Sequence, residues 1–145
     1  MNAGLSERGR PGFKREIRTG ASGDPFPAAV ESRGFTFVGA IGGVDESGKV
    51  VSALVSEQAA RAIRNLAEVL AANGQGLEHV VKCTVYLTDA GDASTVEGVL
   101  KDAFPEDPPA LSRVEVKGLP DGQKFAIEAV AVRPPEGRDV YDFMG

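Results

Sequence analysis

The amino-acid sequence predicts an α/β sandwich, in which one sheet of about five strands carries two helices on one of its faces. Only two segments have apolar residues at helical spacing, whereas short apolar runs typical of strands occupy much of the remaining chain. The 145 residues include 18 glycines and 9 prolines, which predicts frequent turns and short elements. The length predicts a single domain, which we place at residues 13–133.

The first part of the chain is expected to contain little regular structure. Residues 1–12 are rich in Gly, Ser and Arg and nearly lack apolar side chains, so we expect a disordered tail. A short first strand is expected over residues 13–17. Residues 19–27 have the composition of a turn, with prolines on both sides of Phe26. Because proline biases the residue before it towards extended conformations, Phe26 should be held in an extended loop.

A β-hairpin is expected next. Residues 28–31 and 35–40 are two extended runs separated by a Ser-Arg-Gly turn. The glycine-rich residues 39–43 are too flexible for a plain strand, which suggests a close approach of this backbone to a neighbouring group. Residues 45–49 are expected to form a surface turn.

The clearest helix is expected over residues 56–73. Its apolar stripe consists of Ala59, Ile63, Leu66 and Leu70. Ser56 is a plausible N-cap residue, and Asn73 followed by Gly74 supplies a C-terminal stop.

The second half of the chain alternates strands with one further helix. Residues 80–87 are expected to form a strand. One face of that strand comprises Val81, Cys83, Val85 and Leu87, and the other comprises Lys82, Thr84 and Tyr86. We expect a second helix over residues 92–104 and two strands over 110–116 and 124–132. Residues 134–145 are expected to form a polar tail.

The last two strands carry apolar residues on both faces. These residues are Val116, Ile127, Val130 and Val132. One layer of two helices covers only one face of a sheet, and a chain this short is not expected to bury both faces alone. We therefore expect an oligomer in which sheets pack together.

Composition excludes several functional classes. The chain has 21 acidic and 16 basic residues, and its net charge of −5 weighs against non-specific binding of nucleic acid. Its apolar runs are too short to span a membrane. The single cysteine and single histidine exclude multi-cysteine and two-histidine metal sites. We expect a cytoplasmic location, because the first residues lack the apolar segment of a secretory signal.

Glu128 and Arg113 are the residues most able to carry chemistry. A carboxylate among the apolar residues of a strand is costly unless it is paired or functional, and such a group suits proton transfer. The alternative for Glu128 is an edge or solvent-facing position beside a cation. Arg113 offers a bidentate fork for a carboxylate ligand, and its alternative is a surface arginine that pairs across strands with Glu115 or with the neighbours of Glu128. We expect Cys83 to be a buried small hydrophobe and His79 to lie near the surface.

Four segments, which occur along the chain in the same order as in the family, resemble the RidA family, also called the YjgF or reactive-intermediate-deaminase family. PALSRVEVKGLPDGQKFAIEAVAV (109–132) is close to the family's PARS-x-VEV…LP…IEAIAV pattern. VKCTVYLTD (81–89) and STVEGVLKDAF (94–104) resemble its VKTTVF-x-D and F-x-x-VN-x-x-Y-x-x-F segments. QAARAIRNLAEVLAANG (58–74) fits its QA-x-x-x-L-x-N-x-x-x-x-L-x-x-AG helix. The resemblance covers roughly residues 24–133.

The resemblance implies a chorismate-mutase-like sandwich with one mixed sheet of about five or six strands. It implies a homotrimer with clefts between subunits. The implied activity is hydrolysis of reactive enamines and imines derived from amino acids to a 2-oxo acid and ammonia, with no metal or organic cofactor. In the family, an arginine binds the substrate carboxylate, and a glutamate positions or activates the attacking water.

Residue by residue, the resemblance places these roles on a partly altered site. Glu128 matches the family's glutamate, whereas Leu111 stands at the position of its arginine. Phe26 stands where the family has a tyrosine, and Glu97 where it has an asparagine. A backbone donor of the family falls at about Ala40.

Arg113 could compensate for the missing arginine. It lies two residues from Leu111 on one predicted strand, so the two side chains point to the same side, roughly 6–7 Å apart. We hypothesise that Arg113 replaces the family's arginine and that the substrate is shifted or larger.

Two classes of function remain open at this stage. One is an imine or enamine deaminase with an altered substrate range, which Glu128 and Arg113 favour. The other is a non-catalytic small-molecule binder or sensor on the same trimer, which Leu111 and Phe26 favour because they make the pocket less polar. Ribonuclease activity, which is also attached to this family by name, is disfavoured by the acidic charge and the lack of a basic stripe.

Overall fold

The structure is a computed structural model that describes residues 12–20 and 24–134. The tails expected over residues 1–12 and 134–145 therefore lie outside the described residues, apart from one residue each. Within the described ranges, no helix is both long enough and apolar enough to cross a membrane.

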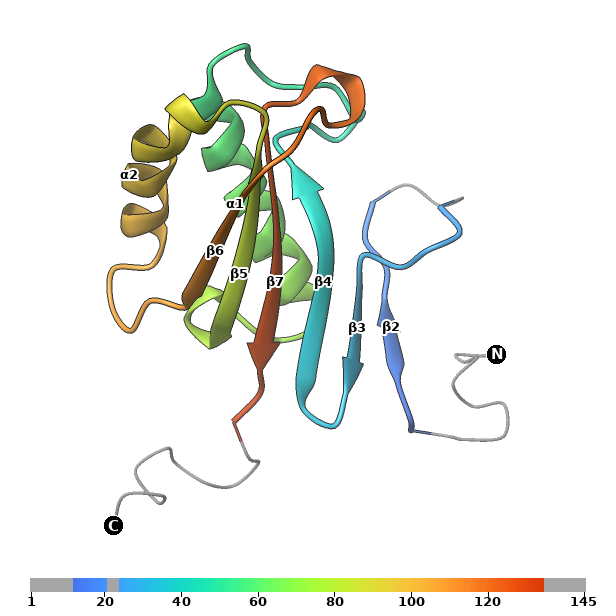
Figure 1. Ribbon diagram of the computed structural model, residues 1–145. Helices are drawn as coiled ribbons and strands as arrows, with labels where there is room; N and C mark the ends of the chain where they lie inside the picture. The colour runs from blue at the N-terminus through green and yellow to red at the C-terminus, as the bar shows by residue number, and fades with distance from the viewer. Residues whose placement is uncertain (1–11, 21–23, 135–145) are drawn as a thin grey trace.

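One mixed sheet of six strands runs through the described residues (Figure 1). In chain order the strands are β2 (Arg15–Ile17), β3 (Ala29–Ser32), β4 (Phe35–Gly42), β5 (Val80–Leu87), β6 (Ala110–Glu115) and β7 (Phe125–Val132). Their order across the sheet is β2-β3-β4-β7-β5-β6. Every neighbouring pair is antiparallel except β5 and β6, which are parallel. The expected mixed sheet of five or six strands, including the hairpin of β3 and β4, is confirmed.

Within the same ranges, two α-helices, α1 (Val55–Ala72) and α2 (Ala93–Ala103), form a layer on one face of the sheet (Figure 1). Helix α1 packs on β4 and β7 and against α2. Its predicted apolar stripe is buried and consists of Ala59, Ile63, Leu66 and Leu70. The predicted N-cap at Ser56 is wrong, because Leu54 is the N-cap residue and its carbonyl accepts the first helical hydrogen bonds. Three short 3₁₀ helices complete the described elements: Leu77–His79, Ala90–Asp92 and Pro120–Gly122.

Two details of the predicted strands are wrong. Strand β2 begins only at Arg15, two residues later than expected. On β5, Val80 is buried and Val81 is exposed, although Val81 was expected on the apolar face with Cys83. The pairing of β5 with β7 shifts register between Val80 and Lys82, and this irregularity turns Val81 to the other side.

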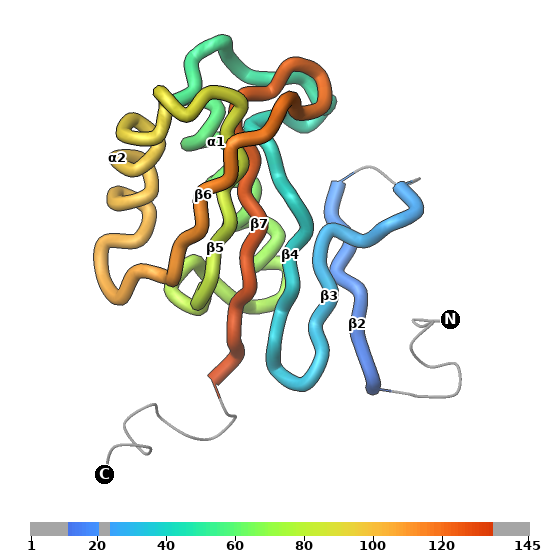
Figure 2. Tube along the Cα trace, in the orientation of Figure 1, coloured from blue at the N-terminus to red at the C-terminus, as the bar shows by residue number. Residues whose placement is uncertain are grey.

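The last strand of the chain, β7, lies in the middle of the sheet, between β4 and β5 (Figure 2). Its alternate side chains are buried beneath the helices, and they belong to Phe125, Ile127, Ala129 and Ala131. Glu128, Val130 and Val132 are half-buried and lie on the opposite face, which we call the open face. The most apolar strand of the chain, which carries one carboxylate, therefore lies in the middle of the sheet.

The open face of the sheet carries exposed apolar side chains. Phe35 and Phe37 of β4 pair in register with Val132 and Val130, and the two phenylalanine rings stack with centroids 6.3 Å apart. Both rings are about half exposed, as is Val114 on β6. Apolar residues thus lie on both faces of the sheet, as the sequence predicted. Exposed apolar groups that gather on one face are typical of an association surface.

The glycine-rich end of β4 approaches α1 closely, as expected. A Cβ atom at Gly43 would lie 2.2 Å from the carbonyl oxygen of Gln58, so a side chain does not fit there. The buried Gln58 side chain donates to the Ser52 carbonyl and accepts from the Lys124 backbone N–H, each at 2.8 Å. These bonds tie together the loops at one end of the sheet.

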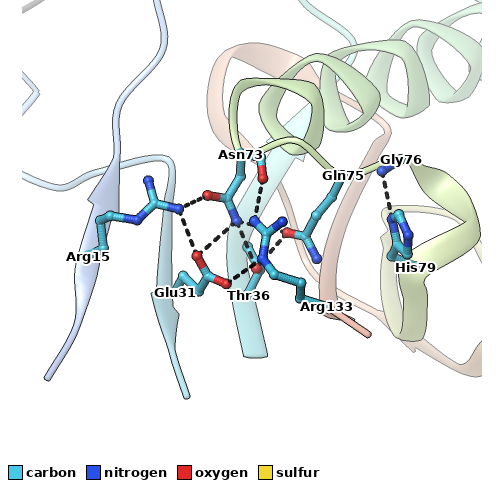
Figure 3. Close-up of polar contacts among 8 residues, drawn as sticks. All are labelled: Arg15, Glu31, Thr36, Asn73, Gln75, Gly76, His79 and Arg133. Atoms are coloured by element: carbon cyan, nitrogen blue, oxygen red, sulfur yellow. Dashed lines mark hydrogen bonds and ion pairs between the residues drawn. The ribbon is translucent and has the colours of Figure 1, made fainter. Parts of the chain in front are cut away.

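A polar network joins the β2–β3 edge to the end of α1 (Figure 3). Arg15 and Arg133 donate to the Glu31 carboxylate at 2.7 and 3.0 Å, and Asn73 donates to it at 3.3 Å. Burial opposes ionisation of Glu31, but hydrogen bonds from Arg133, Arg15 and Asn73 together hold its pKa below the ordinary value of 4.5. The network connects strands β2 and β3 to the end of α1.

Candidate functional site

A cavity of about 460 Å³ lies between α2 and the edge strand β6. Most of its lining is apolar and consists of Cys83, Leu100, Phe104, Pro105, Pro108, Pro109 and Leu111. Three charged side chains complete it: Glu97, Lys101 and Arg113. A mainly apolar hollow with a few charged groups has the character of a small-molecule site.

The cavity exists because β6 is an edge strand and α2 packs against α1. Leu111 and Arg113 are the register partners of Cys83 and Val85 on β5, whose side chains are buried under the helices. Leu111 and Arg113 therefore point to the same side of β6, as strand alternation predicted. That side faces the helices, and both residues line the cavity.

Arg113 forms an ion pair with Glu97 of α2 and not with Glu115. The Arg113 and Glu97 side chains are 48% and 39% exposed, so water screens the pair and it contributes at most about 1 kcal/mol. A ligand carboxylate could therefore compete for the guanidinium. Lys101, one helical turn beyond Glu97, adds a second cation to the lining.

Cys83 and His79 have no chemical features of a reactive group. Cys83 lies at the inner side of the cavity, and its burial raises the pKa of the thiol to about 11. The thiol is then protonated and a poor nucleophile, in agreement with its prediction as a small hydrophobe. His79 Nδ1 accepts the Gly76 backbone N–H at 3.0 Å and closes a turn (Figure 3). Among residues 12–20 and 24–134, His, Cys, Asp and Glu side chains form no cluster of three or more able to hold a metal ion.

Glu128 lies on the open face, where it accepts a hydrogen bond from the Tyr86 hydroxyl. That hydrogen bond raises the pKa of Tyr86, because the phenol donates its proton to a carboxylate. Thr84 is the register partner of Glu128. The Lys82 ammonium group donates to the hydroxyls of Ser112 at 2.9 Å and Thr84 at 3.3 Å. These side chains make a polar row across an otherwise apolar face.

Arg113 and Glu128 lie on opposite faces of the sheet. Arg113 is level with Val85 and Ile127, which face the helices, whereas Glu128 is level with Thr84 on the open face. One chain therefore does not bring the two charged groups together. They can share a site only where the open face of one copy meets the cavity of another.

Phe26 and Ala40 lie outside the cavity lining. Phe26 is 76% exposed in the loop before β3, where its N–H donates to the Asp24 carboxylate at 3.0 Å. Ala40 is exposed on β4, where pairing with β7 shifts between Val38 and Ile41. The binding roles of Phe26 and Ala40 stay predictions.

Sequence reasoning missed Tyr86 and Lys101. Strand alternation put Tyr86 on the polar face of β5, but its contact with Glu128 also requires β7 to lie beside β5. Lys101 follows Glu97 by four positions, and this spacing places both on one side of a helix. That spacing was a usable signal for a second charged lining residue.

The fold and the cavity together define a small α/β-sandwich protein with a candidate small-molecule site at the edge of its sheet. A family model described as Endoribonuclease L-PSP matches residues 18–133. The chain belongs to that family, which is the RidA/YjgF family that its motifs resemble.

Named relatives agree with this assignment. The human protein 2-iminobutanoate/2-iminopropanoate deaminase is 39% identical over 116 residues, which are 80% of this chain and 85% of that protein. The chloroplastic Reactive Intermediate Deaminase A of Arabidopsis thaliana is 35% identical over 108 residues, which are 74% of this chain and 58% of that longer protein. The crystal structure of E. coli TdcF with bound serine has a TM-score of 0.72 and 32% identity, covering 81% of this chain and 94% of TdcF. These comparisons confirm the family's sandwich fold.

Proposed function

We propose that this protein is a deaminase that hydrolyses 2-imino acids, and the enamines that tautomerise to them, to 2-oxo acids and ammonia. The observation that carries the proposal is the apolar cavity with the Arg113 guanidinium in its lining. The name of the human relative, an iminobutanoate and iminopropanoate deaminase, supports the same reaction class. The serine bound to the E. coli relative supports a ligand with a carboxylate.

The proposed active unit is a homotrimer. The open face of each copy would pack against the cavity side of the next, which would cover Phe35, Phe37 and Val114. This packing would also bring Glu128 of one copy to Arg113 of its neighbour. Light scattering coupled to gel filtration tests the assembly, and a monomer at working concentration would contradict it.

In the proposed reaction, Arg113 holds the substrate carboxylate through two parallel hydrogen bonds. Glu128 of the neighbouring copy removes one proton from a water molecule while the water oxygen bonds to the imine carbon. The π bond between carbon and nitrogen breaks, its electron pair goes to the nitrogen, and the nitrogen takes up the proton that Glu128 removed. The resulting carbinolamine carries a hydroxyl group and an amine on one carbon. Proton transfer to the nitrogen then allows the carbon–nitrogen bond to break, and loss of the hydroxyl proton forms the carbonyl. One water is consumed, one ammonia is released, and no electrons are exchanged with another reactant.

Tyr86 is assigned a positioning role in this reaction. Its hydroxyl donates to the Glu128 carboxylate and so limits the directions in which that carboxylate can accept a proton. Tyr86→Phe should reduce kcat while leaving the trimer unchanged.

The function is tested with imines generated in situ from several amino acids by an amino-acid oxidase. The measured quantities are the rates at which ammonia and 2-oxo acid appear, with and without the protein. Glu128→Gln should abolish the acceleration, and Arg113→Ala should abolish it or raise KM strongly while the trimer persists. The control is Arg64→Ala, which removes an exposed arginine of α1 that pairs with Glu68. Undiminished turnover in Glu128→Gln would refute the assigned role.

A non-catalytic binder or sensor is the second candidate. The observation that favours it is the mainly apolar lining of the cavity, in which Leu111 stands at the position of the family's arginine. Absence of turnover with every imine, together with a thermal shift on adding 2-oxo acids, would support this alternative.

A cytoplasmic location is also a proposal. The plant relative is named a chloroplastic protein, so family membership alone does not fix the location of this protein. Imaging of the full chain fused to a fluorescent protein tests it, and accumulation in an organelle would contradict it.

A further inference from the structure

A second cavity, of about 260 Å³, lies at the β2–β3 edge of the sheet, which is the edge opposite β6 (Figure 1). We call it the hairpin pocket, because its lining comes from the start of β2, from β3 and from the turn between β3 and β4. Its charged side chains are those of Lys14, Arg15, Arg33 and Glu31. Three cations therefore share this pocket with one carboxylate, and none of the four residues takes part in the proposed reaction.

The one carboxylate of the hairpin pocket is already paired with cations. Glu31 accepts hydrogen bonds from Arg15 at 2.7 Å and from Arg133 at 3.0 Å, and its side chain is only 14% exposed. Asn73 donates to the same carboxylate at 3.3 Å. Because two guanidinium groups flank Glu31, its charge does not cancel the other positive charges of the pocket.

Arg15 is held in place and still has unused hydrogen-bond donors. Its Nη2 group donates to Glu31 and to the Asn73 side chain, which is itself buried (Figure 3). Its Nη1 and Nε groups make no hydrogen bond with any residue of the described ranges, and the side chain is 59% exposed. A guanidinium that is already oriented loses little further freedom when it binds an anion, so Arg15 is suited to this role.

Lys14 is fixed next to Arg15 by a contact of the preceding residue. The Ser32 hydroxyl donates to the Phe13 carbonyl at 2.6 Å and so ties the chain before β2 to the end of β3. Within the part of the chain that the structure describes, Lys14 forms no ion pair. Its ammonium group is therefore free to contact a ligand.

Arg33 is presented by a tight turn. Ser32 and Phe35 are register partners, and the two residues between them, Arg33 and Gly34, have φ angles of 55° and 85°. Two residues with positive φ between paired strands make a type I′ hairpin turn. The Arg133 N–H donates to the Gly34 carbonyl at 2.8 Å and fastens this turn to the end of β7. Arg33, like Lys14, has no ion-pair partner among residues 12–20 and 24–134.

The charge and size of the hairpin pocket indicate the class of ligand. The net charge of −5 disfavours anions over most of the surface, so anion binding here depends on this local group of cations. A phosphate monoester carries about −1.5 to −2 charges at neutral pH and presents three strong acceptor oxygens. That number of oxygens matches the three cations, whereas a single carboxylate offers one charge and two oxygens. The volume of about 260 Å³ leaves space beside a phosphate group for a few further atoms.

We propose that the hairpin pocket binds the phosphate group of a small phosphate monoester, with Lys14, Arg15 and Arg33 donating to its oxygens. This site is separate from the cavity between α2 and β6 and does not depend on the proposed deaminase function. The pocket forms only when β2, β3 and the turn are paired, so the ligand stabilises the folded protein.

Calorimetry with glycerol 3-phosphate tests the site, with glycerol as the uncharged control. Glycerol 3-phosphate should bind at millimolar concentration or below and raise the Tm, and glycerol should do neither. Added sodium chloride should weaken the binding, because exposed charges are screened. Inorganic phosphate is the second probe: equal affinity would mean that the phosphate group alone is recognised, and weaker binding would mean that the glycerol part contributes. Either result retains the site, whereas no binding of glycerol 3-phosphate at millimolar concentration would overturn it.

Variants locate the binding in the hairpin pocket. Arg33→Asn removes one cation and should raise the Kd for glycerol 3-phosphate about tenfold. Because Asn followed by Gly is the preferred pair for a type I′ turn, this variant should keep or increase the Tm without ligand. Lys14→Gln should weaken binding to a similar extent.

Two controls separate a defined site from general attraction. Arg64→Asn removes an exposed arginine of α1, and Arg113→Ala removes the guanidinium of the other cavity. Both should leave the Kd for glycerol 3-phosphate unchanged. Equal losses in Arg33→Asn and Arg64→Asn would mean diffuse attraction and would overturn the proposal. So would a loss in Arg113→Ala with none in Arg33→Asn, because the phosphate would then lie in the other cavity.

Discussion

Replacing Glu97 by glutamine should tighten the binding of carboxylate ligands. In the structure, the Arg113 guanidinium is already paired with the Glu97 carboxylate. A ligand carboxylate must therefore displace Glu97 or share the guanidinium with it. The two side chains are 48% and 39% exposed, which limits their interaction to about 0.2–1 kcal/mol. Removing this competitor should therefore lower Kd by about 1.5- to 5-fold.

Calorimetry with 2-oxobutanoate at low ionic strength measures this change. The control is Glu68→Gln, since Glu68 forms a similarly exposed ion pair with Arg64 on α1 and should not affect Kd. Added salt should reduce the difference between Glu97→Gln and wild type, because salt screens exposed charges. Weaker binding in Glu97→Gln would refute the reasoning, because it would mean that Glu97 contacts the ligand and does not compete with it.

Three further predictions concern the fold. Glu31→Gln should lower the free energy of unfolding by about 1–3 kcal/mol at neutral pH, because an amide cannot accept charge-assisted hydrogen bonds as well as a carboxylate. Since the folded-state pKa of Glu31 lies below its ordinary value of 4.5, this stability is present above that pH and is lost as the pH falls through the folded-state pKa. Urea titrations of the two proteins should therefore converge in acid, and a difference that persists there would contradict the assignment. Cys83, whose pKa burial raises to about 11, should react with a thiol reagent at mildly alkaline pH only after unfolding, and rapid labelling of the native protein would disprove this. Gly43→Ala should cost about 1–3 kcal/mol in the same urea assay, because its Cβ would meet the Gln58 carbonyl. An unchanged unfolding midpoint would show that α1 can move aside.

Local sequence patterns predicted most elements to within two residues of their observed ends. The strand over 80–87 and the stripe of α1 were correct because alternation and helical spacing are properties of neighbouring residues. The errors at Ser56 and Val81 have a common origin. The start of α1 depends on which carbonyl accepts its first hydrogen bonds, and the orientation of Val81 depends on an irregular pairing with β7. Neither the start of α1 nor the orientation of Val81 can be predicted from the residues of that element alone.

The candidate site was predicted only in part. Spacing along one strand was enough to place Arg113 and Leu111 on one side, and both line the cavity. The sequence did not indicate that Glu128 would lie on the other face of the sheet. A strand pattern shows which residues share a face but does not say which face receives the helices when both are apolar.

The sequence by itself determined the α/β class, the two helices, the outer hairpin and the family, since periodicity and motifs depend on residues close together in the chain. Only the tertiary structure decided that β7 enters the centre of the sheet, where Glu128 meets Tyr86. It also decided that α2 stands beside an uncovered edge strand, which leaves the cavity and brings Glu97 to Arg113. The physical reason is that these contacts depend on the order of the strands and the placement of α2, and both are set by packing between segments far apart in the chain.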